Sequence, residues 1–497
     1  MSTDSGDDQQ RSISAALRHA KLTIDELWMQ YFALGGEAAI IDVDAYVHGL
    51  TELPPLQRDI LAHAVNERLD QLTPPQRATY SRPYRESRPR SQPLAALVEL
   101  LERTELAPPE RLPAVTAAAG QVLGVEITIY VVDYDERLLH PLPVGGASSP
   151  HSLPVDGTVA GRAYRHVRIH PVESAPSPRL WVPMLDGVER LGVLEVVVPS
   201  EDDLYDPGLR TQCRWIAGLV GHLVALLTQY GDAMDLVRLP QQRTVAGELI
   251  WSMLPPLTAG VDDFVVTGLV EPRQAVCGDA FDYSLSERTA SLIVLDAVGH
   301  DPRSGLIAAT ALAACRSARH AGHGLFEQAR TIEEAIGAGF EQGDFVTAVL
   351  AEIDLATGRM RYLNAGHPFP LIMRDGKVVK PLTGGRRLPL GLGRGAVTIA
   401  EEVLQPSDWL VLYTDGVTEA RSANGESFGE ARLTDFLHRE ASTGHPPPET
   451  ARRLVRAVLD HQNGVLQDDA TILLARWTNT NRQMRQVADG RGPSSVG

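Results

Sequence analysis

Four acidic clusters in the second half of the chain constrain its fold most, because each one closes or follows a short apolar run typical of a β-strand. The apolar run 291–295 leads into Asp296, and the run 409–413 leads to Asp415. Four carboxylates that converged at strand ends would need a cation between them, since burying unpaired charge is far costlier than pairing it. Mg²⁺ and Mn²⁺ prefer oxygen ligands of this kind. The clusters are residues 277–282 (CGDAFD), 296–301 (DAVGHD), 413–416 (YTDG) and 467–471 (QDDAT).

Each cluster has a simpler explanation when it is taken alone. The Asp-Gly pair at 415–416 is a turn signal, and the Asp-Asp pair at 468–469 is typical of a solvated loop. Turns alone do not explain four such clusters at strand boundaries within one domain-sized segment. Beyond residue 261, short β-type runs surround two helical stretches, at about 305–318 and 450–461. This order predicts an α+β fold in which helices lie outside two sheets.

The totals narrow the classes of function. A length of 497 residues predicts two to four domains. The net charge of −17 argues against a nucleic acid or an anionic membrane as the partner. The only cysteines, Cys213, Cys277 and Cys315, lack metal-type spacing, which fits a reducing compartment. The polar start resembles no signal peptide, and no run approaches the roughly 20 apolar residues that span a bilayer, so we expect a cytoplasmic protein.

The first half of the chain is predicted to hold two different regions. Residues 1–12 are expected to be a disordered tail, residues 14–72 helical, and the Pro-, Arg- and Ser-rich remainder a linker, so that 1–90 is a helical segment with its linker. Residues 91–232 show a helix, then strands, then a closing amphipathic helix. The strands include 126–133 and 192–198, and the closing helix covers 209–227. Cys213 on that helix is interpreted as a small core residue rather than as an anchor for a pigment or metal.

A single helix is predicted over 236–254, inside a linking segment 233–257, and Pro255 stops it. From the pattern alone, a passive linker and a signalling element are equally compatible with this helix. Its apolar positions can be buried against the following domain or against a second subunit, and a homodimer is our expectation. The polar residues 479–497 are predicted to be a disordered tail.

The segment from about 261 to 477 resembles the bacterial metal-dependent protein phosphatases, which are similar to protein phosphatase 2C and typified by the stage-II sporulation E phosphatase. The resemblance implies an α-β-β-α layered sandwich over 258–478. Residues 242–249 and 253–255 also look like the family's switch helix, which favours the signalling interpretation. The matching stretches are 275–282, 296–300, 344–350, 364–368, 388–392, 413–420 and 468–471.

A second resemblance concerns residues 91–232, which are similar to a GAF sensor domain. The stretches that carry it are 155–164, 180–184 and 190–194. Such domains bind a small ligand or a protein, or simply dimerise, and the sequence does not choose between these roles.

The phosphatase resemblance implies a set of site residues. Asp279, Asp296, Asp415 and Asp468 would hold two Mn²⁺ or Mg²⁺ ions, with the backbone carbonyl of Ala297 as a further ligand. Asp469 would belong to the metal site as a neighbour that supports Asp468. Two such ions would activate a water for hydrolysis of phosphoserine or phosphothreonine.

Four further residues have open roles. His300 either protonates the leaving serine oxygen or shapes a turn. Cys277 stands where the family usually has Gly, and either senses redox state or merely fits its turn. Asp301 also replaces a usual Gly, and its charge could weaken turnover. Arg273 is a weak candidate for binding the substrate phosphate.

The first interpretation is therefore an active phosphatase that is regulated by its sensor. The family resemblance implies a phosphorylated regulator of the anti-anti-sigma type in a partner-switching pathway as its substrate. The alternatives are a catalytically weak pseudophosphatase that binds phosphoproteins, and a hydrolase of small phosphoesters. The presence of all four metal-type Asp residues favours the enzyme.

Overall fold

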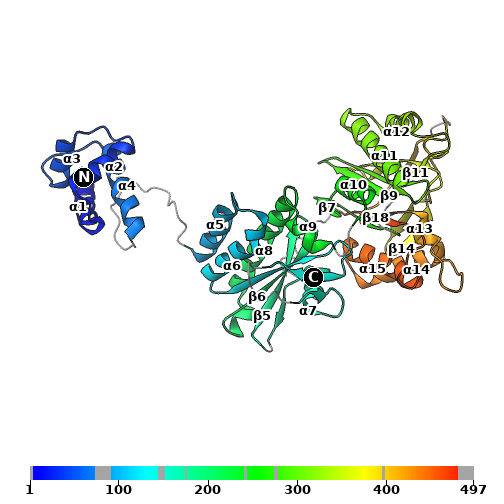
Figure 1. Ribbon diagram of the computed structural model, residues 1–497, viewed down its shortest axis with the longest axis horizontal. Coiled ribbons are helices and arrows are strands. Elements are labelled where there is room, and N and C mark those ends of the chain that lie inside the picture. Colours follow the sequence, from blue (N-terminus) through cyan, green and yellow to red (C-terminus); the bar gives the residue numbers. More distant parts are fainter. Residues whose placement is uncertain are drawn as a thin grey trace, which may run out of the picture. The chain divides into compact units, whose positions relative to one another are not determined.

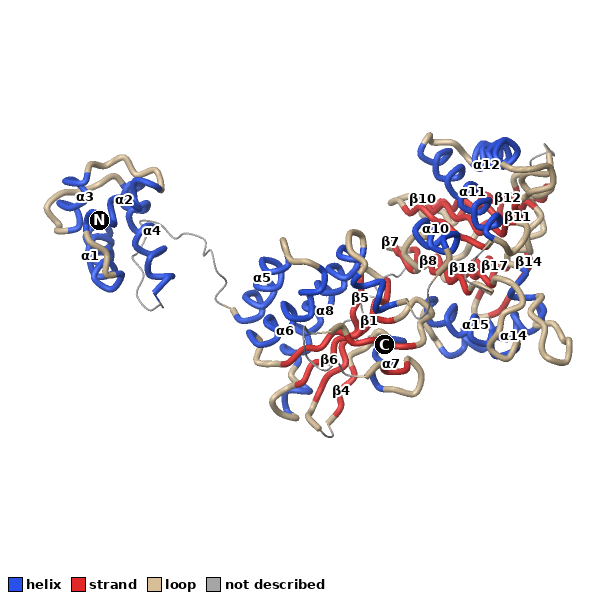
Figure 2. The backbone as a smooth tube through the Cα atoms, viewed as in Figure 1, coloured by secondary structure: helices blue, strands red, loops and turns tan. Residues whose placement is uncertain are grey.

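The computed structural model describes residues 4–72, 91–143, 151–173, 176–239, 243–273, 278–393 and 398–478. The chain divides into two compact units, Met1–Pro89 and Arg90–Gly497 (Figure 1). The first unit is helical, whereas the second contains three sheets (Figure 2). Every helix within the described ranges is too short or too polar to cross a bilayer.

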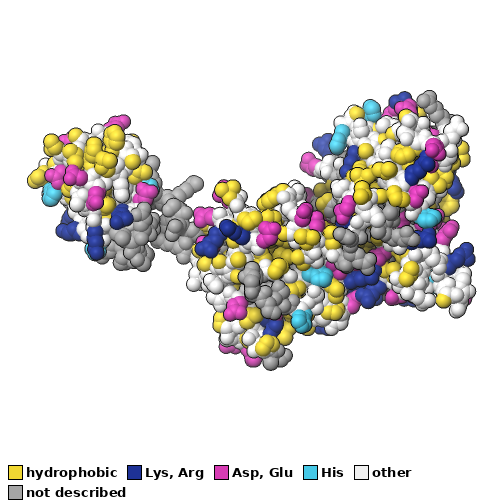
Figure 3. Space-filling view, in the orientation of Figure 1, with side chains coloured by type: hydrophobic (Ala, Val, Ile, Leu, Met, Phe, Trp, Pro, Cys, Tyr) yellow, Lys and Arg dark blue, Asp and Glu magenta, His cyan; other side chains and the backbone are white. Residues whose placement is uncertain are grey.

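The N-terminal unit is a bundle of four helices, in which Ile13, Leu27, Tyr31 and Leu61 are fully buried. A broad area of hydrophobic side chains lies on its visible face (Figure 3). The helices are α1 (Asp4–Ala20), α2 (Ile24–Ala33), α3 (Ile40–Val47) and α4 (Pro55–Leu72).

The predicted disorder over 1–12 is wrong from Asp4 onward, because α1 begins there. The buried Gln9 amide donates to Asp59 of α4 at 2.9 Å, so these two polar residues are buried inside the bundle as a hydrogen-bonded pair. The apolar positions of α1 that follow Gln9 bury one face and support the helix back through its polar start. The predicted linker at 73–90 lies outside the described residues.

The next region is an antiparallel six-stranded sheet in the order β3-β2-β1-β6-β5-β4. Three helices share a core with one face of the sheet, and α7 (Val159–His166) covers the other. The predicted strands and closing helix are confirmed, and Cys213 is a buried core residue as expected. The strands are β1 (Glu126–Val132), β2 (Leu138–Pro141), β3 (Leu153–Pro154), β4 (His170–Val172), β5 (Arg179–Asp186) and β6 (Glu189–Val197), and the three helices are α5 (Gln92–Thr104), α6 (Leu112–Val122) and α8 (Pro207–Thr228).

The continuous helix predicted over 236–254 is wrong, since two short helices replace it. α9 (Ala233–Arg238) ends where Leu239 becomes extended, with φ −86° and ψ 109°. The following residue in the sequence is proline, which disfavours a helical conformation in the residue before it. α10 (Val245–Met253) then starts afresh, and its fully buried Ile250 packs against the helix that follows the Asp296 cluster. The apolar face of α10 is thus covered by its own chain.

The C-terminal region contains two six-stranded sheets packed face to face. The first has the order β15-β12-β11-β10-β9 with β16 beside β12, and the second β14-β13-β17-β18-β8-β7. The strands of the first are β9 (Asp279–Leu285), β10 (Thr289–Ala297), β11 (Val346–Asp354), β12 (Arg359–Ala365), β15 (Arg386–Arg387) and β16 (Ala400–Val403). Those of the second are β7 (Thr258–Val261), β8 (Phe264–Glu271), β13 (Leu371–Arg374), β14 (Lys377–Pro381), β17 (Trp409–Tyr413) and β18 (Ala470–Trp477).

Helices cover both outer faces, which confirms the predicted α-β-β-α layering (Figure 2). α10, α11 (Pro302–His320) and α12 (Leu325–Gly339) pack on the first sheet, while α14 (Gly429–Thr443) and α15 (Pro447–His461) pack on the second. The two predicted helical stretches correspond to α11 and α15, and α12 and α14 were missed. α14 buries only a short apolar group, Leu433, Phe436 and Leu437, among charged residues, which makes its pattern weak.

Candidate active site

The first two predicted metal ligands lie opposite each other at the edge of the first sheet. Asp279 begins β9, Asp296 is the next-to-last residue of β10, and the two are paired across the antiparallel ladder. Asp279 is buried, with 2% of its surface exposed. The Ala297 N–H donates to the Gly278 carbonyl at 3.0 Å, which holds the two strand ends together. The predicted carbonyl ligand therefore lies beside both carboxylates.

The second sheet contributes the other two predicted side-chain metal ligands. Asp415 opens the short helix α13 (Asp415–Thr418) after β17, and Asp468 comes just before β18. Thr414 connects the sheets: its hydroxyl donates to Asp279 Oδ2 at 2.7 Å and accepts from the Thr471 N–H at 2.9 Å. Sequence reasoning missed Thr414. Its position next to Asp415 was a signal, but its partner lies 135 residues away.

Asp469 is used by the backbone around the site. Its Oδ1 accepts from the Arg273 N–H and its Oδ2 from the Gly278 N–H, both at 2.7 Å. It thereby holds both described ends of the loop that leads into β9, as a supporting neighbour would. Gly416 lies so close that a Cβ there would be 1.8 Å from the Asp469 carbonyl, so only glycine fits. Cys277, in the same loop, lies outside the described residues.

The carboxylates of this cluster repel one another. Burial, followed by the charges of Asp296 and Asp469, raises the pKa of Asp279 well above its usual value. Burial, and then Asp415, Asp468 and Asp469, raise the pKa of Asp296 to about 8. The pKa of Asp415 is raised as well, by burial and then by Asp468. The structure thus brings all five predicted Asp residues into one electrostatic group.

The donors suit a hard divalent cation, because they are carboxylate oxygens that lie next to other acids. Asp279 is buried, Asp296 and Asp415 are partly exposed, and Asp468 is exposed. Within the described part of the chain, no three His, Cys, Asp or Glu side chains are grouped closely enough to hold a metal ion as they stand. Repulsion between like charges opposes a tighter grouping until a cation offsets it.

The rim of the site is the turn between β10 and α11. Gly299 adopts a positive φ of 96°, which lets the chain reverse, and His300 beside it is exposed. Asp301 caps α11: its Oδ1 accepts from the N–H groups of Arg303 at 2.9 Å and Ser304 at 3.1 Å. Its presence where the family usually has Gly therefore has a local structural reason. The Arg273 side chain is exposed as well.

A buried histidine supports the strand beside Asp296. His367 Nδ1 lies 2.8 Å from the hydroxyl of Thr347, and Thr347 is paired with Asp296 across β10 and β11. The backbone N–H of His367 donates to Asn364 Oδ1 at 2.9 Å. Burial lowers the pKa of His367 to about 3, so the ring is neutral. The sequence indicated only a turn here, and the contact with the site was missed.

Comparison with known proteins matches most of the region around this site to a family model. Residues 286–478 match the family model described as stage II sporulation protein E (SpoIIE). Protein IcfG of Synechocystis sp. is 30% identical over 143 residues, which are 28% of this chain and 22% of that protein. Phosphoserine phosphatase RsbP of Bacillus subtilis is 27% identical over 164 residues, 32% of this chain and 40% of that protein. The chain thus spans less than half the length of these curated relatives.

Among solved structures, the SiaA-PP2C domain of Pseudomonas aeruginosa is 24% identical, with 51% of this chain and 99% of that domain covered and a TM-score of 0.41. The C-terminal half of the chain is a PP2C-like phosphatase domain. More narrowly, it is a serine/threonine phosphatase domain of the SpoIIE type. Relatives in this wider family bind manganese or magnesium ions.

Proposed function

We propose that this chain hydrolyses phosphoserine or phosphothreonine in a protein substrate. The observation that carries the proposal is the group of carboxylates at one edge of the two sheets, which raise one another's pKa values around the buried Asp279. Two Mn²⁺ or Mg²⁺ ions would be held there by the side chains of Asp279, Asp296, Asp415 and Asp468 and by the carbonyl of Ala297. The name of the relative RsbP, a phosphoserine phosphatase, supports a phosphoserine substrate.

The chain's own residues prepare this reaction. The chemistry that two such cations supply when bound is a more acidic water and a stabilised phosphoryl charge. Thr414 orients the Asp279 carboxylate through its hydrogen bond. Asp469 holds the backbone N–H groups of Arg273 and Gly278, and Gly278 directly precedes Asp279. His300, exposed at the rim, would donate a ring N–H proton to the leaving serine Oγ.

The proposed substrate is a phosphorylated regulator of the anti-anti-sigma type, on the strength of the family resemblance. We propose further that residues 91–232 sense a small ligand or a protein, that 233–257 transmit the signal, and that 258–478 catalyse. A homodimer is the assembly we propose, and sedimentation velocity of the full chain tests it.

The test uses the full chain with Mn²⁺ on a serine-phosphorylated anti-anti-sigma-type protein and on an aryl phosphate. We expect release of inorganic phosphate that prefers the protein substrate and is abolished by chelator. Tight binding of the phosphoprotein without phosphate release would instead show a pseudophosphatase. Hydrolysis of the aryl phosphate without any preference for the protein would show a hydrolase of small phosphoesters.

A further inference from the structure

The turn between β1 and β2, residues 133–137, is one of the parts of the sensor sheet that contact the phosphatase domain. Hydrogen bonds within the sensor region fix the conformation of this turn. The Asp133 carboxylate accepts from the N–H groups of Arg137 at 2.7 Å and Leu138 at 3.1 Å. Glu136 adopts a positive φ of 51°, and its buried carboxylate accepts from Arg190 at 2.8 Å and from the Tyr164 hydroxyl at 2.7 Å. A turn held in this way presents its remaining side chains in defined directions.

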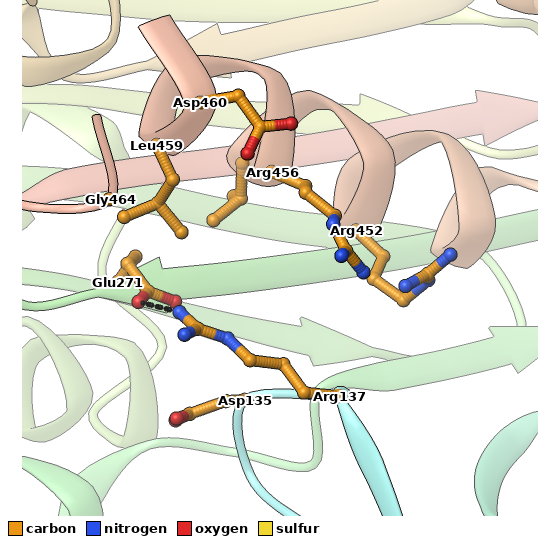
Figure 4. Close-up of a pocket in the computed structure, with 9 residues that line it drawn as sticks. Asp135, Arg137, Glu271, Arg452, Arg456, Leu459, Asp460 and Gly464 are labelled. Carbon is orange, nitrogen blue, oxygen red and sulfur yellow. Dashed lines mark hydrogen bonds and ion pairs between the residues drawn. The ribbon is translucent and has the colours of Figure 1, made fainter. Parts of the chain in front are cut away.

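Two of those side chains contact the catalytic half of the chain. The Tyr134 ring lies 5.2 Å from the ring of Trp251 in α10. Arg137 donates to Glu271 Oε1 at 2.7 Å, as Figure 4 shows. Glu271 is the last residue of β8, and it is paired with Ala470, which directly follows Asp469. The Arg137 contact therefore lies at the end of β8, across from the residue that follows Asp469.

The connection from Glu271 to the site is short. Two residues after Glu271, the Arg273 N–H donates to Asp469, and the other Asp469 oxygen accepts from Gly278, the residue before Asp279. Holding the end of β8 thus helps to hold Arg273 on Asp469, whose other oxygen binds the residue before Asp279. This route passes through the second sheet and does not involve α10.

The Arg137 contact is open to solvent on the arginine side only. The Arg137 side chain is 49% exposed and the Glu271 side chain 16%, so withdrawal of Arg137 would leave a mostly buried carboxylate at the end of β8 without this partner. Arg190 and Glu449 are almost fully buried on both sides, so that pair has no comparable solvated alternative. Arg137 borders a cavity of about 130 Å³ that is also lined by Asp135, Arg452 and Arg456 (Figure 4). The guanidinium can leave Glu271 and remain solvated.

We propose that the Arg137–Glu271 ion pair couples the sensor to the metal site, and that a sensor state which withdraws Arg137 loosens the contacts of Arg273 and Gly278 with Asp469 and weakens cation binding. The inference rests on the proposed function, since it concerns regulation of the same site. The coupling is carried by a contact between two regions that share one compact unit.

The test compares full-length Arg137→Ala, Glu271→Gln and the double variant with the wild type. Mn²⁺ binding is measured by calorimetry, and hydrogen exchange is measured on peptides that cover 264–273, 278–285 and 466–474. Arg103→Ala is the matched control, because it removes an ion pair with Glu99 that is confined to α5. We expect each single variant to weaken Mn²⁺ binding by about threefold to tenfold, and the double variant by no more than either one. Exchange should rise around Glu271 and Asp469, while the control behaves as wild type.

Arg137→Ala that binds Mn²⁺ and exchanges like Arg103→Ala would overturn the inference, as would single effects that multiply in the double variant. Hydrogen exchange needs neither turnover nor a cation, so its result stands even if no phosphoprotein is hydrolysed. An active enzyme with an unaffected Arg137→Ala variant would refute the coupling alone. A protein that shows the coupling but hydrolyses no phosphoprotein would refute the proposed function alone.

Discussion

Two groups of charged residues lie within the same compact unit, and the pKa values of their acids shift in opposite directions. Between the sensor sheet and α15, Glu449 is fully buried and bound by Arg190 at 3.3 Å and Arg452 at 2.9 Å. Burial alone would raise the pKa of Glu449, but the Arg452 hydrogen bond and the charge of Arg190 outweigh it and lower the pKa. At the phosphatase site, burial and neighbouring carboxylates together raise the pKa of Asp296 to about 8.

Each group contains a buried acid, Glu449 in one and Asp279 in the other, so burial of an acid does not distinguish a structural cluster from a functional one. The difference lies in compensation. The Glu449 group contains its own positively charged residues, Arg190 and Arg452, so its charge is balanced within the folded chain. The Asp group contains acids only and is complete only when a cation is supplied from outside. An acidic cluster that the fold leaves uncompensated is therefore the better indicator of a site.

The largest expected effect tests the uncompensated group. Asp296→Asn or Asp415→Asn should lower phosphatase activity by roughly a hundredfold or more, because each removes ligand charge from a two-ion site. Phosphate release from the phosphoprotein at several Mn²⁺ concentrations measures this. Asp435→Asn, an exposed carboxylate of α14, is the control and should retain full activity. Undiminished activity of both site variants in chelator would disprove the assignment.

The compensated group should respond in stability. Glu449→Gln leaves Arg190 and Arg452 buried with less negative charge, and we expect a loss of about 3 kcal/mol in the free energy of unfolding. Urea unfolding of the full chain measures it. Glu401→Gln, which removes the exposed partner of Arg359, should cost less than about 0.5 kcal/mol. Equal losses in the two variants would mean that Glu449 and its two arginines stabilise the fold no more than the exposed Arg359–Glu401 pair does.

Without cations, a substitution in the Asp group should raise the free energy of unfolding, whereas Glu449→Gln lowers it. With chelator at pH 8, Asp296→Asn should be more stable than wild type by roughly 2 kcal/mol, because it removes a charge that the fold disfavours. The Asp296 pKa is raised from 3.8 to about 8, so wild type should lose stability as the pH rises through this window. Urea unfolding at several pH values should show a flatter dependence in Asp296→Asn. A destabilised variant at pH 8 would show that the carboxylates do not repel as described.

The smallest effect is expected at Asp301, an acid near the cluster whose charge is satisfied by the α11 backbone. Asn caps helices as well as Asp, so Asp301→Asn should change activity by less than about twofold and stability by less than about 0.5 kcal/mol. The same phosphate release and urea measurements apply. A tenfold rise in activity would place the Asp301 charge with the repelling cluster instead.

Much of the phosphatase half was readable from local patterns. Asp296 and Asp415 stand at the ends of apolar runs, and the runs and the helices α11 and α15 were recognised from their periodicity. The helix break after Leu239 was also present in the sequence as a proline, but the apolar spacing on both sides suggested one helix.

The sequence by itself determined the order of the acidic motifs, the α+β layering and the SpoIIE-type class of the C-terminal half. Tertiary structure alone decided that the Thr414 hydroxyl meets Asp279, that Asp469 binds Arg273 and Gly278 rather than standing free, and that Arg137 reaches Glu271. These partners lie more than 130 residues apart. A local pattern indicates which face of a strand is buried, but the register between strands and the docking of one sheet on another decide which side chains meet.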